Sequence, residues 1–500
     1  MRGINKRFGA VAANADVELH VTKGTVHGIV GENGAGKSTL MSILYGFYTA
    51  DSGGIEVFGQ SVNIRSADDA IAVGVGMVHQ HFMLVDTLTA IENVMLGAEP
   101  HFLLQRADGQ TRGKLEALMQ ATGLHVKLDS LVADLPVGDR QRLEILKALY
   151  RGAKVLILDE PTAVLTPQET EHLFTVLRGL RAQGTTILLI THKLKEVMGL
   201  CDHVTVMRAG RVVHEIAIGD ASIESLAEAM VGRKVQMGRV EDGLRVPGKV
   251  LMRVTGVTVR DQLKVSRLTD LSLDLCAGEI VGVAGVSGNG QSELLDVLSG
   301  MLTPTTGQMQ LGEQVFEAPN WLDPLTARKA GVAHVPEDRH ARALVMNFPA
   351  WESAVLGYDG LADYASGPWM KHAGMRKSTQ YMMERFDVRP RDPELLCSKF
   401  SGGNQQKLVL ARELGQSPTV LLVGQPTRGV DIGAIEFIYS RLRAMRDAGC
   451  AVLVVSSELD EILALSDRVI VMNQSRVAGE LAISECTEAG LGLLMTGSAQ

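Results

Sequence analysis

The chain has 500 residues, of which 46% are hydrophobic and 21% are charged, and its formal net charge is −8 at pH 7. This length exceeds what one hydrophobic core usually supports, so we expect two or three domains. The negative net charge argues against sequence-independent binding to nucleic acid, because such binding depends on Lys and Arg that neutralise phosphates.

The cysteine pattern and the hydropathy pattern exclude two further classes. Five widely spaced cysteines with no C-x-x-C pair indicate reduced thiols rather than a disulfide frame or a zinc site. No apolar run reaches the ~18 residues of a membrane span, and the N-terminus does not have the shape of a signal peptide. We therefore expect any membrane role to pass through a partner.

A phosphate-binding loop is predicted at residues 31–39, GENGAGKST, between the apolar run at 26–30 and a helical pattern at 40–44. The spacing is G-x-x-x-x-G-K-[ST] in the strand–loop–helix setting that this motif requires. Glycines let backbone N–H groups curl around an anion, and the helix N-terminus adds partial positive charge. The Lys would reach the β- and γ-phosphates, and the Ser hydroxyl would reach Mg²⁺. The predicted nucleotide-binding residues are Gly31, Glu32, Asn33, Gly34, Ala35, Gly36, Lys37, Ser38 and Thr39.

Strand and helix patterns alternate further along the chain. The apolar runs at 153–158 and 185–190 predict buried parallel strands, and residues 142–150 and 406–414 predict helices. This alternation predicts a doubly wound α/β fold with a mostly parallel sheet. Ligands of such folds bind at the carboxyl ends of the strands, where the predicted phosphate-binding loop lies.

The chain contains one pattern twice. Residues 135–141 recur at 400–406, residues 158–162 at 423–427 and residues 191–194 at 456–459, each 265 positions later. The phosphate-binding loop recurs as GVSGNGQS at 285–292, 254 positions after the first copy. Residues 236–248 are Gly-rich, mixed in charge and without periodicity, which is typical of a linker. We expect a first domain at 1–235, a linker at 236–249 and a second domain at 250–500.

Five motifs follow one another in the first copy: the phosphate-binding loop, the triplet ending at Gln80, the segment 135–141, the pair Asp159-Glu160 and His192. This order resembles the nucleotide-binding domain of ATP-binding-cassette (ABC) proteins, and the likeness extends over nearly the whole chain, twice. The tandem layout resembles the ATP-binding subunits of bacterial importers for simple sugars and nucleosides. Segments 161–169 and 424–429 resemble the nucleoside-type branch.

The resemblance implies two tandem P-loop NTPase domains of the α/β class, each a mostly parallel sheet core with an inserted helical subdomain. The inserted segments would be residues 85–133 and 345–395, and they would contact membrane subunits.

The resemblance also implies a role for each motif of the first copy. Asp159 would hold Mg²⁺ together with Ser38 and Gln80. Glu160 would orient or deprotonate the attacking water. His192 would bind the γ-phosphate, and Gln80 would sense the γ-phosphate and the metal. The predicted catalytic residues are thus Glu160, His192 and Gln80, with ATP and Mg²⁺ as cofactors.

The adenine base would stack on an aromatic residue, for which Phe8 is placed as in the family. A core position for Phe8 is the alternative. No Phe, Tyr or Trp lies between Lys249 and Ile280, where the second copy would need one.

The second copy lacks most of the predicted chemistry. Its residues Gln291, Gly424, Gln425, Ser457 and Glu337 stand at the positions of Lys37, Asp159, Glu160, His192 and Gln80. Backbone N–H groups of the glycine-rich loop would still suit a phosphate. Without the Lys, the metal carboxylate and the base, we expect negligible hydrolysis there.

The segments 135–141 and 400–406 correspond to the signature motif of ABC proteins. Here the first copy is the degraded one and the second copy is intact. The second copy keeps Ser401, Gly402 and Gly403, whereas the first has PVG at 136–138, where Pro removes a backbone donor. The resemblance implies that the two cassettes pack head to tail. The intact residues of the first copy would then meet the intact signature of the second, which predicts one hydrolytic and one inert composite site.

The implied partners are two integral-membrane permease subunits and an extracytoplasmic solute-binding protein, without nucleic acid, at the cytoplasmic face of the cell membrane. We expect a nucleoside as the solute, with a pentose or hexose as the second choice. The rival class is a soluble tandem ABC ATPase that acts on ribosomes or nucleic acid. Ribosome-associated relatives have a long charged inter-domain segment, and DNA-repair relatives carry zinc-binding Cys pairs; this sequence has neither.

Overall fold

The structure is a computed structural model that describes residues 1–9, 11–79, 82–98, 109–162, 165, 167–234, 238–239, 246–286 and 288–496. The chain divides into two compact units, Met1–Val235 and Gln236–Gln500. None of the helices in the described residues combines the length and the apolar character needed to cross a membrane.

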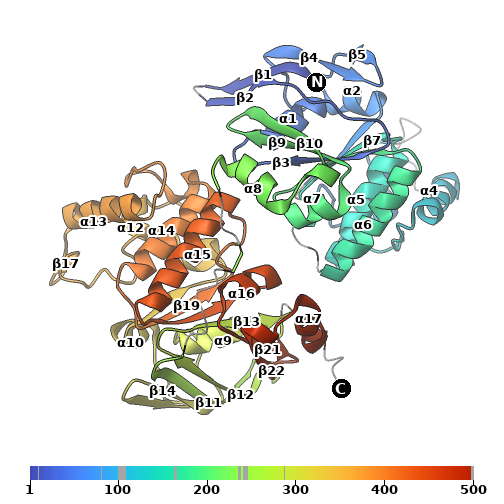
Figure 1. Ribbon diagram of the computed structural model, residues 1–500. Coiled ribbons are helices and arrows are strands. Elements are labelled where there is room, and N and C mark those ends of the chain that lie inside the picture. The colour runs from blue at the N-terminus through green and yellow to red at the C-terminus, as the bar shows by residue number, and fades with distance from the viewer. Residues whose placement is uncertain are drawn as a thin grey trace. The chain divides into compact units, whose positions relative to one another are not determined.

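The first unit is built on a six-stranded sheet in the order β10-β9-β3-β8-β7-β6. Figure 1 labels β3, β7, β9 and β10 of this sheet. Its strands are β3 (Val26–Val30), β6 (Val75–Val78), β7 (Val155–Asp159), β8 (Thr186–Ile190), β9 (His203–Arg208) and β10 (Arg211–Ala217). Neighbours from β6 to β9 pair in parallel, and only β10 is antiparallel. The two strands predicted at 153–158 and 185–190 are β7 and β8, so the mostly parallel α/β fold is confirmed.

A second, antiparallel sheet in the order β2-β1-β4-β5 completes the first unit. Its strands are β1 (Arg2–Phe8), β2 (Val11–Val17), β4 (Ser52–Val57) and β5 (Gln60–Val62). Ile4, Val17 and Ile55 of these strands share one apolar cluster with β3 and the first helix. The sequence patterns had not predicted this sheet, because most positions of its strands are exposed or half-buried and form no continuous apolar run.

The helices of the first unit alternate with its strands along the chain. They are α1 (Lys37–Leu44), α2 (Ala67–Ala72), α3 (Ala90–Met95), α4 (Gly109–Thr122), α5 (Val137–Tyr150), α6 (Pro167–Ala182), α7 (Leu194–Leu200) and α8 (Ile223–Val231), with 3-10 turns at Val132–Asp134 and Ile218–Asp220. Helix α5 begins at Val137, five residues before the predicted start at 142. Helices α3 and α4, from the predicted inserted segment, pack on α5 through Val94, Leu115 and Leu146.

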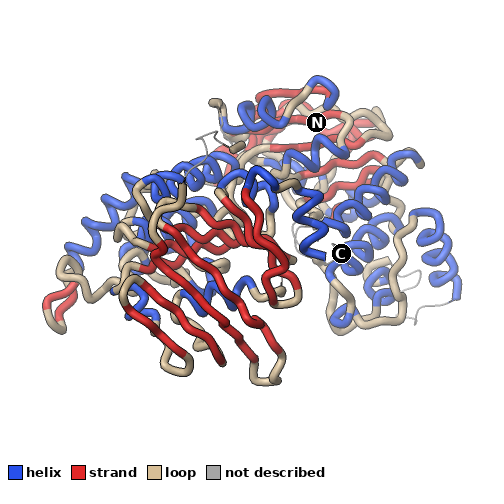
Figure 2. Tube along the Cα trace, turned by 60° about the horizontal axis from the view of Figure 1, so that its bottom comes forward, coloured by secondary structure: helices blue, strands red, loops and turns tan. Residues whose placement is uncertain are grey.

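The second unit repeats the first. Its six-stranded sheet has the order β16-β19-β20-β13-β21-β22, and its four-stranded sheet the order β12-β11-β14-β15. Figure 2 shows the strands in red with the helices in blue around them. The strands are β11 (Val250–Arg260), β12 (Ser266–Cys276), β13 (Ile280–Gly285), β14 (Thr306–Leu311), β15 (Gln314–Glu317), β16 (Val332–Val335), β19 (Val420–Gly424), β20 (Ala451–Val455), β21 (Arg468–Asn473) and β22 (Arg476–Ala482), with a small hairpin of β17 (Ala365–Ser366) and β18 (Trp369–Met370).

Its helices follow the order of those in the first unit, and the short helix α11 is additional among the described residues. They are α9 (Gln291–Leu298), α10 (Pro324–Lys329), α11 (Arg339–Arg342), α12 (Ala350–Ser353), α13 (His372–Arg385), α14 (Gly402–Leu414), α15 (Ile432–Asp447), α16 (Leu459–Leu465) and α17 (Glu488–Thr496), with 3-10 turns at Cys397–Lys399 and Ile483–Glu485. Helices α12 and α13 and the hairpin lie in the predicted inserted segment.

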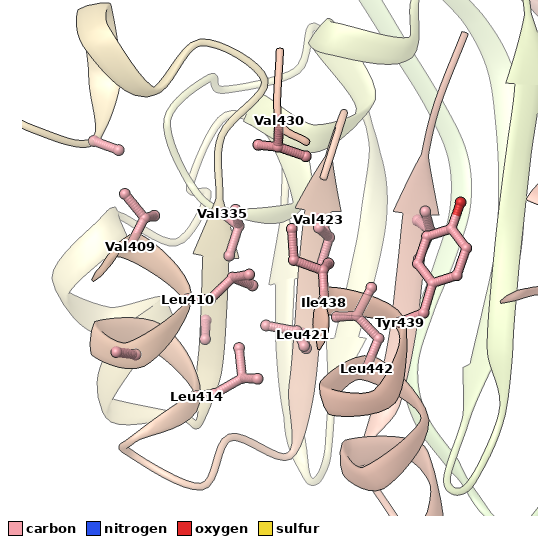
Figure 3. Packing of buried hydrophobic residues seen from close by; sticks show 14 of the residues in the cluster. Val335, Val409, Leu410, Leu414, Leu421, Val423, Val430, Ile438, Tyr439 and Leu442 are labelled. Carbon is pink, nitrogen blue, oxygen red and sulfur yellow. The ribbon is translucent and has the colours of Figure 1, made fainter. Parts of the chain in front are cut away.

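Helix α14, which carries the intact signature at its start, packs with α15 on strands β16 and β19 (Figure 3). Seven side chains of this cluster are each at most 5% exposed: Val335, Leu410, Leu414, Leu421, Val423, Ile438 and Leu442. Each buried Leu or Ile of this size contributes about 1.5–3 kcal/mol. This packing holds the first turn of α14 beside the loops that follow β16 and β19, where Gly402 approaches the carbonyl of Gly429.

Candidate functional site

The first phosphate-binding loop joins the fully buried strand β3 to helix α1. Lys37 is the first residue of α1 and is only 6% exposed. Its Nζ donates hydrogen bonds to the carbonyls of Gly31 at 2.7 Å and Glu32 at 3.1 Å. The ammonium group is therefore held over the loop, where a phosphate bound to the backbone N–H groups would receive its charge.

Two glycines of this loop have left-handed backbone angles, for different reasons. Gly36 has φ +97°, and a Cβ there would lie 2.3 Å from the carbonyl O of Ala13 and 2.7 Å from Nδ2 of Asn14. Gly34 has φ +84°, but a Cβ there would meet nothing within 4 Å. Asn14, buried on β2, donates from Nδ2 to the carbonyl of Gly36 at 3.1 Å. Sequence reasoning missed Asn14, since it lies 22 positions before Gly36.

Asp159 ends β7 and Glu160 follows it, beside the phosphate-binding loop. Burial and the neighbouring Glu160 raise the pKa of Asp159, while a hydrogen bond from Ser38 and the charge of Lys37 lower it. A buried carboxylate beside a hydroxyl is an oxygen donor set that suits Mg²⁺, whose charge would favour the ionised carboxylate. The residues Ser38 and Asp159 thus fit the metal that the resemblance implies.

Glu160 and His192 are in direct contact, as their Oε1 and Nδ1 atoms are 2.9 Å apart. Burial opposes ionisation of Glu160, but the hydrogen bond and charge of His192, with Lys37 and Lys193 nearby, hold the pKa of Glu160 below its usual value. The backbone of Glu160 is left-handed, with φ +46°, and its N–H donates to the carbonyl of Ile190 at 2.9 Å. This conformation aims the carboxylate across the strand ends toward His192.

A buried carboxylate that sequence reasoning missed connects the two loops that carry Glu160 and His192. Glu196 on α7 is 8% exposed and accepts hydrogen bonds from Thr162 Oγ1 at 2.5 Å and Thr191 Oγ1 at 3.2 Å. Thr162 follows Glu160 by two positions, and Thr191 precedes His192. The only signal in the sequence was an acidic residue at helical spacing among apolar positions.

Of two further predicted site residues, the structure describes Phe8 but not Gln80. Phe8 lies at the end of β1 and is 44% exposed, so the alternative of a core position is wrong. Its ring contacts that of Tyr48, with the centroids 5.1 Å apart. Gln80 lies outside the described residues, and its catalytic and metal-binding roles stay predictions.

The second phosphate-binding loop keeps two left-handed glycines but lacks the Lys side chain of the first. Gly288 and Gly290 have φ +90° and +100°. Gln291 takes the place of Lys37 and donates from Nε2 to the carbonyl of Val286 at 3.1 Å. Gln425 has φ +47° and accepts hydrogen bonds at Oε1 from the N–H of Ser457 at 3.2 Å and its Oγ at 3.1 Å. The neutral pair therefore reproduces the contact of Glu160 with His192.

The signature segments begin α14 and α5. Ser401 is the residue before α14, and its Oγ accepts a hydrogen bond from Asn404 Nδ2 at 2.9 Å. Gly402 and Gly403 form the first turn of that helix. Pro136 occupies the corresponding place before α5, where it offers neither a hydroxyl nor an N–H.

A family model described as ABC transporter matches residues 15–163 and 268–428, one span in each unit. The chain belongs to the ABC transporter family. The predicted tandem ABC fold is therefore confirmed, and this ABC protein is an ATPase.

Relatives of this ABC protein match over its full length. Guanosine import ATP-binding protein NupO of Bacillus subtilis is 43% identical over 100% of this chain and 97% of that protein. Nucleoside import ATP-binding protein NupA of Lactococcus lactis is 41% identical over 99% and 97%. Glucose import ATP-binding protein TsgD13 of Haloferax volcanii is 39% identical over 99% and 95%.

A solved structure of the archaeal ribosome recycling factor aABCE1 with ribosomal stalk protein aP1 has a TM-score of 0.66 and 20% identity to this ABC protein. The match covers 98% of this chain and 92% of that chain. At this identity the likeness shows the tandem fold alone.

Proposed function

We propose that this chain is the ATP-hydrolysing, energy-coupling subunit of an ABC importer for nucleosides or simple sugars. The observation that carries the proposal is full-length similarity to proteins named for solute import. The guanosine and nucleoside import relatives share 43% and 41% identity, against 39% and 36% for glucose and ribose import relatives. We therefore favour a nucleoside as the solute, with a simple sugar as the alternative.

Hydrolysis is proposed to occur at the first phosphate-binding loop. Its backbone N–H groups and Lys37 bind the phosphates, and Phe8 stacks on the adenine. Ser38 and Asp159, with Gln80, would hold Mg²⁺, which offsets the charge of the β- and γ-phosphates. Glu160 orients the attacking water and takes its proton. His192 binds the γ-phosphate, and its contact with Glu160 also positions that carboxylate.

The distribution of intact and degraded motifs supports a composite site. The first unit has Lys37, Asp159, Glu160 and His192 but lacks the signature Ser, whereas the second unit has Ser401 and lacks the four others. Independent decay would rarely sort the defects in this complementary way. We propose that the units, joined by residues 236–249, pack head to tail when ATP binds. Ser401, Gly402 and Gly403 then complete the site of Glu160, and the second composite site is inert.

The proposed partners are two integral-membrane permease subunits and an extracytoplasmic solute-binding protein. The subunit would lie at the cytoplasmic face of the membrane, where ATP-driven closure favours one conformation of the permease over the other. A role on ribosomes has only the fold likeness at 20% identity in its favour.

Uptake in a strain that lacks this chain would test the proposal. The strain is complemented with the native chain, with Glu160→Gln, or with Glu215→Gln, which changes an exposed residue of β10. We expect labelled guanosine or another nucleoside to enter with the native and Glu215→Gln chains only. Uptake of ribose or glucose alone in this pattern would reassign the solute. Uptake that is independent of the chain for every solute would contradict the importer.

A further inference from the structure

We infer that the second unit binds a nucleoside triphosphate together with a divalent cation, and that Glu337 supplies the carboxylate that Asp159 supplies in the first unit. The inference goes beyond the proposed function, which needs only one competent site. It rests on how the strand-end carboxylate has been replaced.

The hydroxyl that would bind the cation has a carboxylate partner in both units. In the first unit the Ser38 side chain is hydrogen-bonded to Asp159, at the end of β7. Ser292 occupies the equivalent position in the second loop, and its Oγ donates to Oε2 of Glu337 at 2.5 Å. Glu337 follows β16, the strand that pairs with β19. The carboxylate therefore reaches the same hydroxyl from the neighbouring strand.

Gly424, which stands in place of Asp159, makes room for this carboxylate. A Cβ on Gly424 would lie 2.5 Å from Cγ of Glu337 and 3.0 Å from its backbone N. It would also lie 2.8 Å from Cδ1 of Leu295. An aspartate at 424 and the present position of Glu337 thus exclude each other. The two substitutions are complementary, since one strand loses the carboxylate and its neighbour gains one in the same space.

The anion-binding part of the second loop is preserved as well. Gly288 and Gly290 keep the left-handed angles of Gly34 and Gly36. The eight-residue helix α9 begins at Gln291, so its first N–H groups point at the loop. Gln291 brings no charge where Lys37 brings one. Neutralisation of a bound triphosphate therefore depends more on the cation here than in the first unit, and binding should require the cation strictly.

The same unit is unsuited to hydrolysis. The carboxamide of Gln425 cannot take a proton from water at neutral pH, and its Oε1 is already engaged by Ser457. A nucleotide that binds at this site would remain intact.

Equilibrium binding of a slowly hydrolysed ATP analogue to the purified full chain tests the inference, with Mg²⁺ or with EDTA. We expect two analogues per chain with Mg²⁺, and photo-crosslinking of one of them to the peptide that contains residues 288–292. Glu337→Gln retains a partner for Ser292 but removes the charge, so binding at the second site should weaken about ten-fold or more. Glu313→Gln, at an exposed turn of the same unit, should leave both sites unchanged.

A relocated carboxylate gives the complementary test. Glu337→Ala should lose the cation-dependent second site, and Glu337→Ala with Gly424→Asp should regain it, because the aspartate enters the vacated space. Mn²⁺ counted by electron paramagnetic resonance gives a direct measure of the cation. One analogue per native chain would overturn the site, and cation-dependent second binding in Glu337→Gln would overturn the role of Glu337. Neither analogue binding nor Mn²⁺ counting depends on solute uptake. A negative result here can therefore be distinguished from a failure of the proposed importer function.

Discussion

The Nδ1 atom of His192 lies 2.9 Å from Oε1 of Glu160, although 32 positions separate the two residues in the chain. Parallel strands β7 and β8 end side by side, and the left-handed backbone of Glu160 turns its side chain toward the neighbouring strand end. The contact places Glu160, the proposed base, and His192, which we propose positions it, next to the loop that holds Lys37.

Glu160→Gln should lower the steady-state ATPase rate by at least about 100-fold, because an amide cannot take the proton of the attacking water. Nucleotide affinity should change little, since the loop and Lys37 are intact. Phosphate release measures the rate, and the exposed Glu215→Gln is the matched control. Retention of more than a small fraction of the activity would contradict the role of Glu160.

His192→Ala should move the acid limb of the pH–rate profile to higher pH. Burial raises the pKa of Glu160, and the hydrogen bond and charge of His192 are foremost among the influences that lower it. In the native protein the carboxylate stays ionised until the pH falls through this lowered pKa; without His192, burial dominates and protonation begins earlier. The position of the acid limb is obtained by measuring the remaining kcat/KM of the variant as a function of pH. The exposed His214→Ala, on β10, should leave the profile where it is.

Asp159→Asn should stabilise the nucleotide-free protein while abolishing the Mg²⁺-dependent part of binding at the first site. Burial and Glu160 raise the pKa of Asp159 above 3.8, so its ionised form costs stability at neutral pH. We expect Tm to rise by about 1–3 °C at pH 7.5. The difference should vanish below about pH 3.8, where the carboxyl is protonated in both folded and unfolded chains. A lower Tm for the variant at pH 7.5 would contradict this account.

Gly36→Ala and Gly34→Ala form a matched pair that separates contact from backbone strain. Both positions have positive φ, but only at Gly36 would the new Cβ meet backbone, at 2.3 Å from the carbonyl of Ala13. Gly34→Ala should cost about 1–2 kcal/mol of unfolding free energy, the usual cost of a left-handed residue. Gly36→Ala should cost clearly more, since the loop must move away from β2. Urea unfolding without nucleotide compares the free energies of unfolding of the two variants. Equal losses would contradict the prediction, because they would mean that the contact between the new Cβ at position 36 and the carbonyl of Ala13 carries no penalty.

Arg339→Ala should slow ATP hydrolysis about ten-fold without weakening nucleotide binding at the first site. Its Nη1 donates to the carbonyl of Arg428 at 2.7 Å, and its Nε donates to Oε1 of Gln405 on α14 at 3.4 Å. Arg339 is therefore a positioning residue for the start of α14, where the proposed composite site has Ser401. A lower kcat with unchanged KM is the expected signature. Arg476→Ala, an exposed residue of β22, should change neither constant. A higher KM with unchanged kcat would contradict the assignment.

The parts that could be predicted from sequence are local patterns with fixed spacing. The phosphate-binding loop, the Asp159-Glu160 pair and His192 each follow an apolar run, and strands and helices of this kind are recognisable within a short window. Their recurrence at 254 and 265 positions predicted the tandem organisation. The order of these motifs was enough for the family, which the comparisons confirmed.

Only the tertiary structure could show which distant residues meet. Asn14 contacts the carbonyl of Gly36, Glu196 joins the loops of Thr162 and Thr191, and Glu337 fills the space left by Gly424. None of these contacts has a spacing rule, because each depends on how separate elements pack. A glutamate at 337 is a simple substitution in the sequence. It becomes a candidate cation ligand only because β16 and β19 are neighbours and a glycine leaves the space between them open.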